Sequence, residues 1–183
     1  MADKSAKDNG NQTTGMTTRE QLIQKLNEDL SREYQAVIAY VVYSQKIKGA
    51  EDMTIAKELE THAREELNHA MIIAKQIDYL GGDMTVVAKE VKTSDDPREM
   101  LRFDLDNENE TVREYRERIR QCESLQEYAI AEAIRKILAD EQDHQIELAT
   151  ALGEEVRPAG LPPQIAEESK PTPAESGRLS KSK

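Results

Sequence analysis

Two pairs of residues in this sequence place a histidine three positions after a glutamate: Glu66 with His69, and Glu141 with His144. On an α-helix, residues three apart are neighbours on one face, so each pair would present a carboxylate and an imidazole side by side. These two groups are common ligands of iron and other first-row transition metals. Because the chain has only three histidines and two of them follow this spacing, the pattern predicts a metal site.

Each pair interrupts an apolar stripe, and two other predicted helices carry a single glutamate at the matching place. Apolar residues at spacings of three and four form four stripes, each apolar at both ends and polar near its middle. Burial of an unpaired carboxylate is strongly unfavourable, and no Lys or Arg lies on the stripes to compensate it. Two divalent metal ions would balance four carboxylates. The predicted metal ligands are Glu33, Glu66, His69, Glu108, Glu141 and His144.

Several residues near these ligands have more than one interpretation. Glu110 competes with Glu108 but lies off the stripe, so Glu108 is preferred. His62, one turn before Glu66, fits a core histidine or a partner of the ligands better than a ligand. Asp140 is either a solvated aspartate or the group that orients a ligating imidazole.

Tyr40 lies two turns after Glu33 on the same stripe. It is either a core residue or an electron donor close to the metals. Glu65 and the charged residues between Arg113 and Arg120 are interpreted as solvent-exposed helix faces.

The composition favours a helical protein with one domain. Of the 183 residues, 33% are charged and 37% hydrophobic, with one Phe and no Trp. The formal net charge of −11 argues against a nucleic-acid or anionic-membrane partner and suits a cationic one. The single cysteine, Cys122, excludes an intramolecular disulfide. Because no stretch reads as a signal peptide or a membrane span, we expect a cytoplasmic protein.

Turn and capping residues mark the expected helix ends. Thr17 and Ser124 each precede a glutamate by three positions, the spacing of a capping box, and are expected to start the first and fourth helices. The second helix is expected over about residues 51–80. Asp96 followed by Pro97 predicts the start of the third helix, and Gly153 the end of the fourth.

Three segments follow from this pattern: a disordered segment 1–16, a helical domain 17–152 and a Pro-rich, disordered tail 153–183. Short connections make the first and second helices, and the third and fourth, antiparallel neighbours. Residues 81–94 could span about 45 Å when extended, about the length of a 30-residue helix. The chain is therefore predicted to be all-α: a four-helix bundle of two antiparallel hairpins joined by a long crossover.

With these residues the chain resembles the ferritin-like di-iron proteins, in which two helices give one Glu each and two others a Glu-x-x-His pair. The nearest likeness, over residues 17–152, is to the bacterioferritins, and residues 99–108 are similar to the start of their third helix. The resemblance implies a ferritin-like fold, a homo-oligomer and two iron ions per subunit. It also implies oxidation of Fe(II) by dioxygen or peroxide, followed by storage of the ferric product.

The resemblance also implies a role for each matching residue. Glu66 and Glu141 correspond to the two bridging carboxylates, and Glu33 and Glu108 to the terminal ones. His69 and His144 would each bind one iron, and Tyr40 matches a tyrosine close to the di-iron centre.

Two features depart from the bacterioferritin pattern. Leu67 and Asn68 occupy the interval in which that family has a haem-binding methionine, so we expect no haem here. A Pro-rich tail replaces the short fifth helix that lines a symmetry axis of the family's cage, so a closed cage does not follow from the resemblance.

Besides the ferroxidase, three other functions are compatible with this bundle. One is a peroxide scavenger of the rubrerythrin or manganese-catalase kind, although no Cys-x-x-Cys module is present. Another is a DNA-protecting or partner-binding mini-ferritin, against which the acidic charge counts. The third is a cargo of an encapsulin shell, because residues 177–181 weakly resemble the targeting peptides of such cargo.

Overall fold

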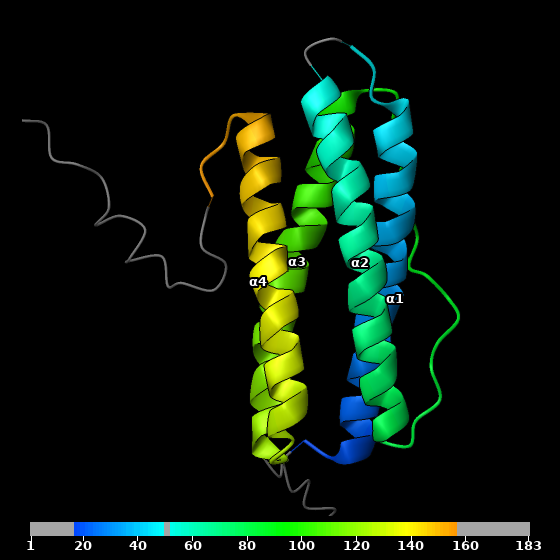
Figure 1. Cartoon of the computed structure of the whole chain (residues 1–183), viewed down its shortest axis with the longest axis vertical. Helices are drawn as coiled ribbons and strands as arrows, with labels where there is room; N and C mark the ends of the chain where they lie inside the picture. Colours follow the sequence, from blue (N-terminus) through cyan, green and yellow to red (C-terminus); the bar gives the residue numbers. More distant parts are fainter. Residues whose placement is uncertain (1–16, 50–51, 157–183) are drawn as a thin grey trace, which may run out of the picture.

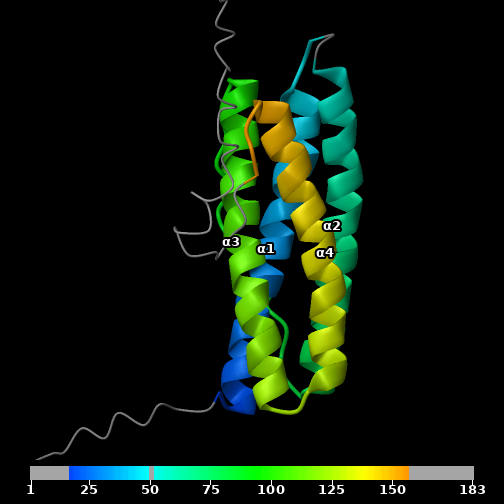
Figure 2. The same ribbon diagram turned by 90° about the vertical axis from the view of Figure 1, so that its left-hand side faces the viewer.

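The structure, a computed structural model, describes residues 17–49 and 52–156. It is a bundle of four helices, and the described residues contain no strand (Figures 1 and 2). α1 and α2 form one antiparallel hairpin, α3 and α4 the other, so the predicted fold class is confirmed. The helices are α1 Arg19–Lys46, α2 Met53–Tyr79, α3 Pro97–Ser124 and α4 Tyr128–Leu152.

Two helices begin at side-chain caps close to the predicted ones. The capping box of α1 uses Thr18 and Gln21, not Thr17: the Thr18 hydroxyl accepts from the Gln21 N–H, and the Gln21 side chain accepts from the Thr18 N–H. Asp96 caps α3 by accepting a hydrogen bond from the Arg98 N–H, and Pro97 stands at the first helical position as predicted.

The predicted cap of α4 at Ser124 is wrong. Ser124 is the last residue of α3, and its hydroxyl donates to the Gln121 carbonyl of that same helix. The chain reverses at Gln126, whose φ is 62°. Consequently α4 starts only at Tyr128, without a side-chain cap, and ends as predicted at Gly153 in the left-handed conformation.

The crossover between α2 and α3 runs along α1 over much of the length of the bundle, which makes α2 and α3 parallel (Figure 1). Polar side chains of α1 hold its backbone at successive turns. Ser31 donates to the Val87 carbonyl, and Gln35 to the Glu90 carbonyl. Closer to the end of α1, Tyr43 donates to the Lys92 carbonyl.

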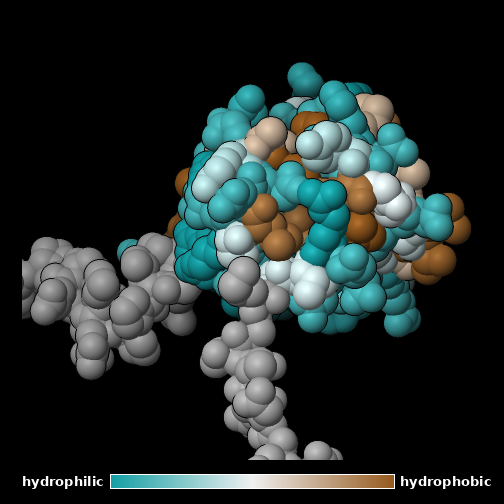
Figure 3. Space-filling view, turned by 90° about the horizontal axis from the view of Figure 1, so that it is seen from below, coloured by the Kyte–Doolittle hydropathy of each residue, from teal (hydrophilic) through white to brown (hydrophobic). Residues whose placement is uncertain are grey.

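The apolar core is divided into two clusters. One includes Leu26, Ile77 and Ile134, and the other includes Leu59 and Leu148. Seen from the end at which α1 begins, the surface is mostly hydrophilic, with hydrophobic side chains gathered near its middle (Figure 3). The polar residues of the stripes lie between the two clusters, in the middle of the bundle.

No helix in the described part of the chain is long and apolar enough to cross a membrane. The predicted disordered segment 1–16 and residues 157–183 of the predicted tail lie outside the described residues. The cytoplasmic location stays a prediction.

Candidate metal centre

The structure brings all six predicted ligand side chains together between the two core clusters, and all six are buried. They form two overlapping groups, in each of which the donor atoms lie within 4.8 Å of one another. Glu66 and Glu141 belong to both groups. Glu33 and His69 complete one group, and Glu108 and His144 complete the other.

Both imidazoles turn the same nitrogen toward the carboxylates. Nδ1 of His69 lies 3.4 Å from Glu66 Oε2 and 3.3 Å from Glu141 Oε1. Nδ1 of His144 lies 3.0 Å from Glu66 Oε1 and 3.3 Å from Glu141 Oε2. Glu66 and Glu141 thus place one oxygen beside each ring, which is the arrangement that two bridging carboxylates need.

The outer nitrogen of each imidazole is held by a carboxylate outside the group of six. His69 Nε2 lies 3.1 Å from Asp140 Oδ2, and His144 Nε2 lies 2.9 Å from Glu65 Oε2. Such a contact fixes the ring and leaves Nδ1 for a metal. The structure thus favours the second interpretation of Asp140, whereas the interpretation of Glu65 as merely solvent-exposed is wrong.

Two tyrosines hold the outermost glutamates of the group. Tyr40, a predicted site residue, donates its phenolic hydrogen to Glu108, and Tyr115 donates in the same way to Glu33. Burial, and next the nearby carboxylate, raise the pKa of both phenols, so both keep their protons. Tyr115 has no place in the sequence-based set of site residues.

A signal for Tyr115 is nevertheless present in the sequence. Five central residues of the first hairpin have a like residue in the second hairpin at one constant offset, and Tyr115 occupies the position that corresponds to Tyr40. The pairs are Glu33 and Glu108, Tyr40 and Tyr115, Glu65 and Asp140, Glu66 and Glu141, and His69 and His144. The site is therefore built from two similar halves.

The crowding of acidic groups changes their affinity for protons. Burial, and then the charges of Glu66 and Glu141, raise the pKa of Glu33 well above its usual value. Burial and the charges of Glu141 and Glu66 do the same to Glu108. Protons or metal cations must therefore neutralise these carboxylates.

The same carboxylates raise the pKa of the two imidazoles. Burial disfavours the charged ring of His144, but the adjacent carboxylates of Glu141 and Glu66 outweigh it and raise its pKa to about 12. The pKa of His69 is raised in the same way by Glu141, Glu33 and Glu66, against the effect of burial. Positive charge is thus strongly favoured at this place.

The donor set fits a pair of cations. Buried atoms without a hydrogen-bond partner include Glu33 Oε2, Glu66 Oε1, both oxygens of Glu141 and Nδ1 of His144. All of these atoms belong to the groups that could hold a metal. A small cavity lies against the glutamates between α1 and α3, next to Gln35 and Asn107.

A buried ionic cluster lies beside the site. Asp29 accepts hydrogen bonds from Nε and Nη2 of Arg118, at 2.6 and 3.2 Å, and one from Arg32 at 2.6 Å. Arg118 is fully buried, so the interpretation of residues 113–120 as a solvated face is wrong for this residue. Its partner is on another helix, which explains why spacing within α3 does not reveal it.

Known proteins with similar sequences are ferritins. The profile of the ferritin-like domain family matches residues 23–157. The bacterioferritin of Brucella melitensis is 26% identical over 141 residues, which cover 73% of this chain and 88% of that protein. The bacterial ferritin of Synechocystis is 26% identical over 134 residues, which cover 72% of this chain and 86% of that protein.

Solved structures that are similar to this one also belong to ferritin-like proteins. A ferritin-like, di-iron-carboxylate protein from Bacillus anthracis has a TM-score of 0.71 and 33% identity, covering 73% of this chain and 96% of that one. The bacterioferritin of Rhodobacter capsulatus, described with a metal-free dinuclear site and haem iron, has a TM-score of 0.69 and 25% identity. It covers 75% of this chain and 87% of that one. The predicted resemblance is confirmed.

Proposed function

The chain belongs to the ferritin-like domain family, and from that membership we propose that it is a ferroxidase for iron storage or detoxification. It would bind two Fe(II) per subunit and oxidise them to Fe(III) with dioxygen or peroxide. The observation that carries this proposal is the pair of ligand groups that share Glu66 and Glu141. Two ions held by shared carboxylates are adjacent, so one oxidant can take an electron from each.

The residues have complementary roles in this proposal. Glu33 and His69 hold one Fe(II), Glu108 and His144 hold the other, and Glu66 and Glu141 bind both. Carboxylate oxygen and imidazole nitrogen are suitable ligands for iron, and the charge of two divalent ions balances the four buried carboxylates.

The outer contacts keep these ligands in place. Tyr40 holds the carboxylate of Glu108, and Tyr115 that of Glu33. Asp140 and Glu65 keep a proton on Nε2 of His69 and His144, which leaves Nδ1 as the ligand atom. The apolar clusters on either side exclude bulk water from the ions.

The electrons balance with either oxidant. Each Fe(II) loses one electron, so two Fe(II) and two protons convert dioxygen to hydrogen peroxide, or hydrogen peroxide to two water molecules. The product is Fe(III), which the protein would store or release as a less reactive form.

The proposal extends to the assembled protein. We propose that the protein is a homo-oligomer. We also propose that it binds no haem, because Leu67 presents an exposed apolar side chain with no ligand atom for a haem iron. The predicted encapsulin shell depends on residues 177–181, which lie outside the described residues.

Replacement of Glu141 by Ala tests the ferroxidase proposal. The variant should lose rapid Fe(II) oxidation while keeping its helix content, because it removes one of four buried carboxylates whose charges repel one another. Oxidation is followed by stopped-flow absorbance in air-saturated buffer and, separately, with hydrogen peroxide. Glu132→Ala, which removes an exposed glutamate of the same helix, should oxidise Fe(II) at the wild-type rate. A wild-type rate in Glu141→Ala would refute the proposal.

A further inference from the structure

The cavity between α1 and α3 reaches the glutamates of the metal centre. Its volume is about 10 Å³, which is room for about one water-sized molecule. Four of the six predicted ligands line it, namely Glu33, Glu66, Glu108 and Glu141. Gln35, Ala36 and Asn107 also line it and are only partly buried. The cavity therefore lies between the ligand groups and the solvent.

The two similar halves of the site share this cavity. Glu33 and its counterpart Glu108 each belong to one ligand group, and Glu66 and its counterpart Glu141 belong to both. A small molecule in the cavity would therefore lie beside both groups. An oxidant needs such a place if it is to take one electron from each of two Fe(II).

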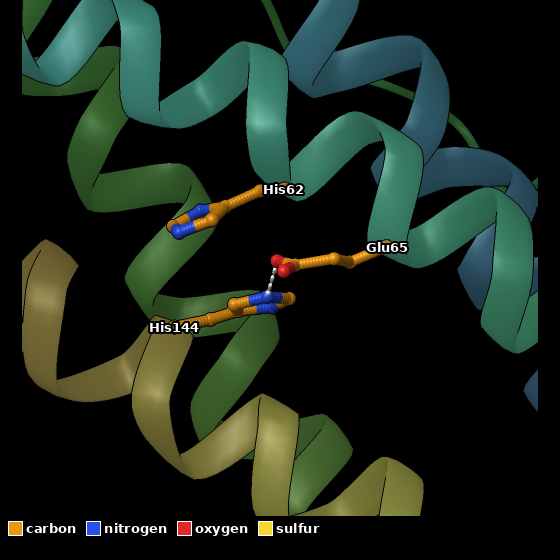
Figure 4. A group of neighbouring side chains, drawn as sticks. All are labelled: His62, Glu65 and His144. Atoms are coloured by element: carbon orange, nitrogen blue, oxygen red, sulfur yellow. Dashed lines mark hydrogen bonds and ion pairs between the residues drawn. The ribbon is translucent and has the colours of Figure 1, made fainter.

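Other side chains occupy the outer nitrogens of both imidazoles. The His62 ring stacks on the His144 ring, with centroids 4.1 Å apart, and Glu65 Oε2 lies 2.9 Å from His144 Nε2 (Figure 4). Asp140 has the corresponding contact with Nε2 of His69. Because the space behind both rings is used in this way, the cavity is the better place for an oxidant.

Arg32 lines the cavity and has a free hydrogen-bond donor. Its side chain is only 7% exposed, and its Nη2 lies 2.6 Å from Asp29 Oδ1. Its Nη1 lies 3.3 Å from Glu110 Oε1. Its Nε is buried and has no hydrogen-bond partner among the described residues. An unpaired buried donor is unfavourable, so a molecule in the cavity that accepts a hydrogen bond from Nε would be stabilised there.

An ion pair alone does not explain Arg32. Asp29 already accepts two hydrogen bonds from Arg118, and Nε of Arg32 takes no part in the ion pairs. The counterpart of Arg32 in the other half is Asn107, a neutral residue that lines the same cavity. The positive charge is therefore a feature of one half only, and the fold of the hairpin does not require it.

The two oxidants of the proposed function differ in their interaction with a guanidinium group. Hydrogen peroxide accepts hydrogen bonds at both oxygens, and its oxygens become negatively charged as they are reduced. Dioxygen is nonpolar and a very weak acceptor. A guanidinium N–H that lines the cavity therefore favours peroxide, because charge-assisted hydrogen bonds are the stronger ones.

We propose that hydrogen peroxide is the oxidant of this site and that it binds in the cavity with one oxygen accepting a hydrogen bond from Arg32 Nε. Each of two Fe(II) gives one electron to the peroxide, and the O–O bond breaks. Two protons from solvent then complete two water molecules. The guanidinium stabilises the negative charge that develops on the oxygen during this step. The inference rests on the proposed function and adds Arg32 as the residue that selects the oxidant.

Arg32→Asn, which copies the residue of the other half, tests this assignment. Each protein is loaded with Fe(II) under anaerobic conditions and then mixed, in a stopped-flow instrument, with hydrogen peroxide or with dioxygen at the same concentration. The wild type should react faster with peroxide. Arg32→Asn should react with peroxide at least about 10-fold more slowly, whereas its rate with dioxygen should stay unchanged.

Two further variants separate the donor from the charge and from the fold. Arg32→Lys keeps a positive charge for Asp29 but has no Nε–H, so it should lose the rapid reaction with peroxide even if Arg32→Asn does not fold. Arg113→Asn is the matched control, because it makes the same change at an exposed arginine of α3. It should keep both wild-type rates.

A measurement without iron oxidation keeps the two proposals apart. Wild-type crystals loaded with Zn(II), which is not oxidised, and soaked in hydrogen peroxide should show a two-atom density within hydrogen-bond distance of Arg32 Nε. The density should be absent in Arg32→Lys. The inference is overturned if the wild type lacks this density, or if the Arg32 variants slow the reactions with both oxidants equally. Failure of the wild type to oxidise Fe(II) with either oxidant would instead contradict the proposed function.

Discussion

Tyr40 and Tyr115 each hold a glutamate of the opposite hairpin. Tyr40 belongs to α1 and donates to Glu108 of α3, whereas Tyr115 belongs to α3 and donates to Glu33 of α1. A buried carboxylate that loses its only phenol donor is both less well placed and less well solvated. The two phenols therefore link the geometry of each candidate ligand group to the packing of both hairpins.

Tyr115→Phe and Tyr40→Phe should weaken metal binding. Loss of an outer partner of a metal ligand usually reduces affinity by about 10- to 100-fold, and each variant should do so for Co(II), measured by titration calorimetry. Tyr34→Phe, at a half-buried position of α1, should bind Co(II) with unchanged affinity. Unchanged affinity in Tyr115→Phe would show that the phenol is only a core residue.

Metal binding should become tighter as the pH rises. The pKa values of Glu33, Glu108, His69 and His144 are raised in the folded protein, so cations must displace protons from these groups. The metal-induced increase in Tm should therefore grow between about pH 6 and about pH 8, near the usual pKa of histidine.

The same shifts set the pH dependence of stability when a chelator is present. A group with a raised pKa stabilises the fold below its unfolded pKa, and this contribution is lost as the pH rises through the folded pKa. The lowered pKa of Glu66 has the opposite effect on stability, but four groups with a raised pKa outweigh this single group. The free energy of unfolding in chelator should thus fall as the pH rises above the usual pKa of histidine, about 6.5. A free energy of unfolding that rises with pH would contradict this expectation, and a metal-induced increase in Tm that shrinks with pH would contradict the preceding one.

The meeting of the six candidate ligands in one place was predictable because each Glu-x-x-His pair lies within one helix turn, and each single glutamate interrupts an apolar stripe. Local spacing is enough for such residues. The burial of Arg118 was not predictable in this way, because it depends on Asp29 from a different helix. Tyr115 could have been found, but only by comparing the two hairpins with each other.

At the scale of elements, α1 supports the crossover as well as the site. Its Asn27 donates to the Asp83 carbonyl at 2.9 Å and accepts from the Thr85 N–H at 2.6 Å. Together with Ser31 and Gln35 it holds the first part of the crossover. The opposite face of the same helix carries Glu33, so one helix connects the path of the chain with the ligand set.

Asn27→Ala should destabilise the protein by about 1–3 kcal/mol, the usual effect of leaving hydrogen-bonding groups unpaired. Urea unfolding followed by circular dichroism measures this change. Gln24→Ala, at an exposed position of α1, should change the stability by less than about 0.5 kcal/mol. Hydrogen exchange should become faster at the Thr85 amide in Asn27→Ala, and an unchanged rate would count against the role of Asn27.

Helix existence was easier to predict than helix ends. The apolar stripes predicted all four helices, but the capping pattern at Ser124 failed because its hydroxyl bonds back into α3. A serine near a helix end can serve either the helix behind it or the helix ahead of it. Here the chain ends α3 and turns at Gln126, which has a positive φ. A glutamine does not predict this conformation, so the turn could not be located from the sequence.

At the scale of the whole molecule, the hairpin of α1 and α2 leaves apolar side chains in contact with solvent. They include Ile38, Val41, Leu67 and Met71. Exposed apolar residues on helices commonly mark contacts between subunits, and this agrees with the proposed homo-oligomer.

Leu67→Lys combined with Met71→Lys should lower the native mass of the protein, because two buried charges at an interface are strongly unfavourable. Light scattering after size-exclusion chromatography measures the mass. Val86→Lys combined with Val87→Lys is the control, since both residues are exposed in the crossover. An unchanged mass in the first variant would place the subunit contact elsewhere.

The constant offset between the two hairpins also bears on the origin of the chain. Consider a single hairpin that carries Glu33, Tyr40, Glu66 and His69 and pairs with an identical copy of itself. Such a pair would contain the glutamates, tyrosines and histidines of the present site, and a gene duplication with fusion would join the two copies into one chain. In a pair of identical hairpins each residue must occur twice, once in each copy. His62 and Arg118, whose counterparts are Ile137 and Tyr43, can therefore differ from the other half only because both hairpins belong to one chain.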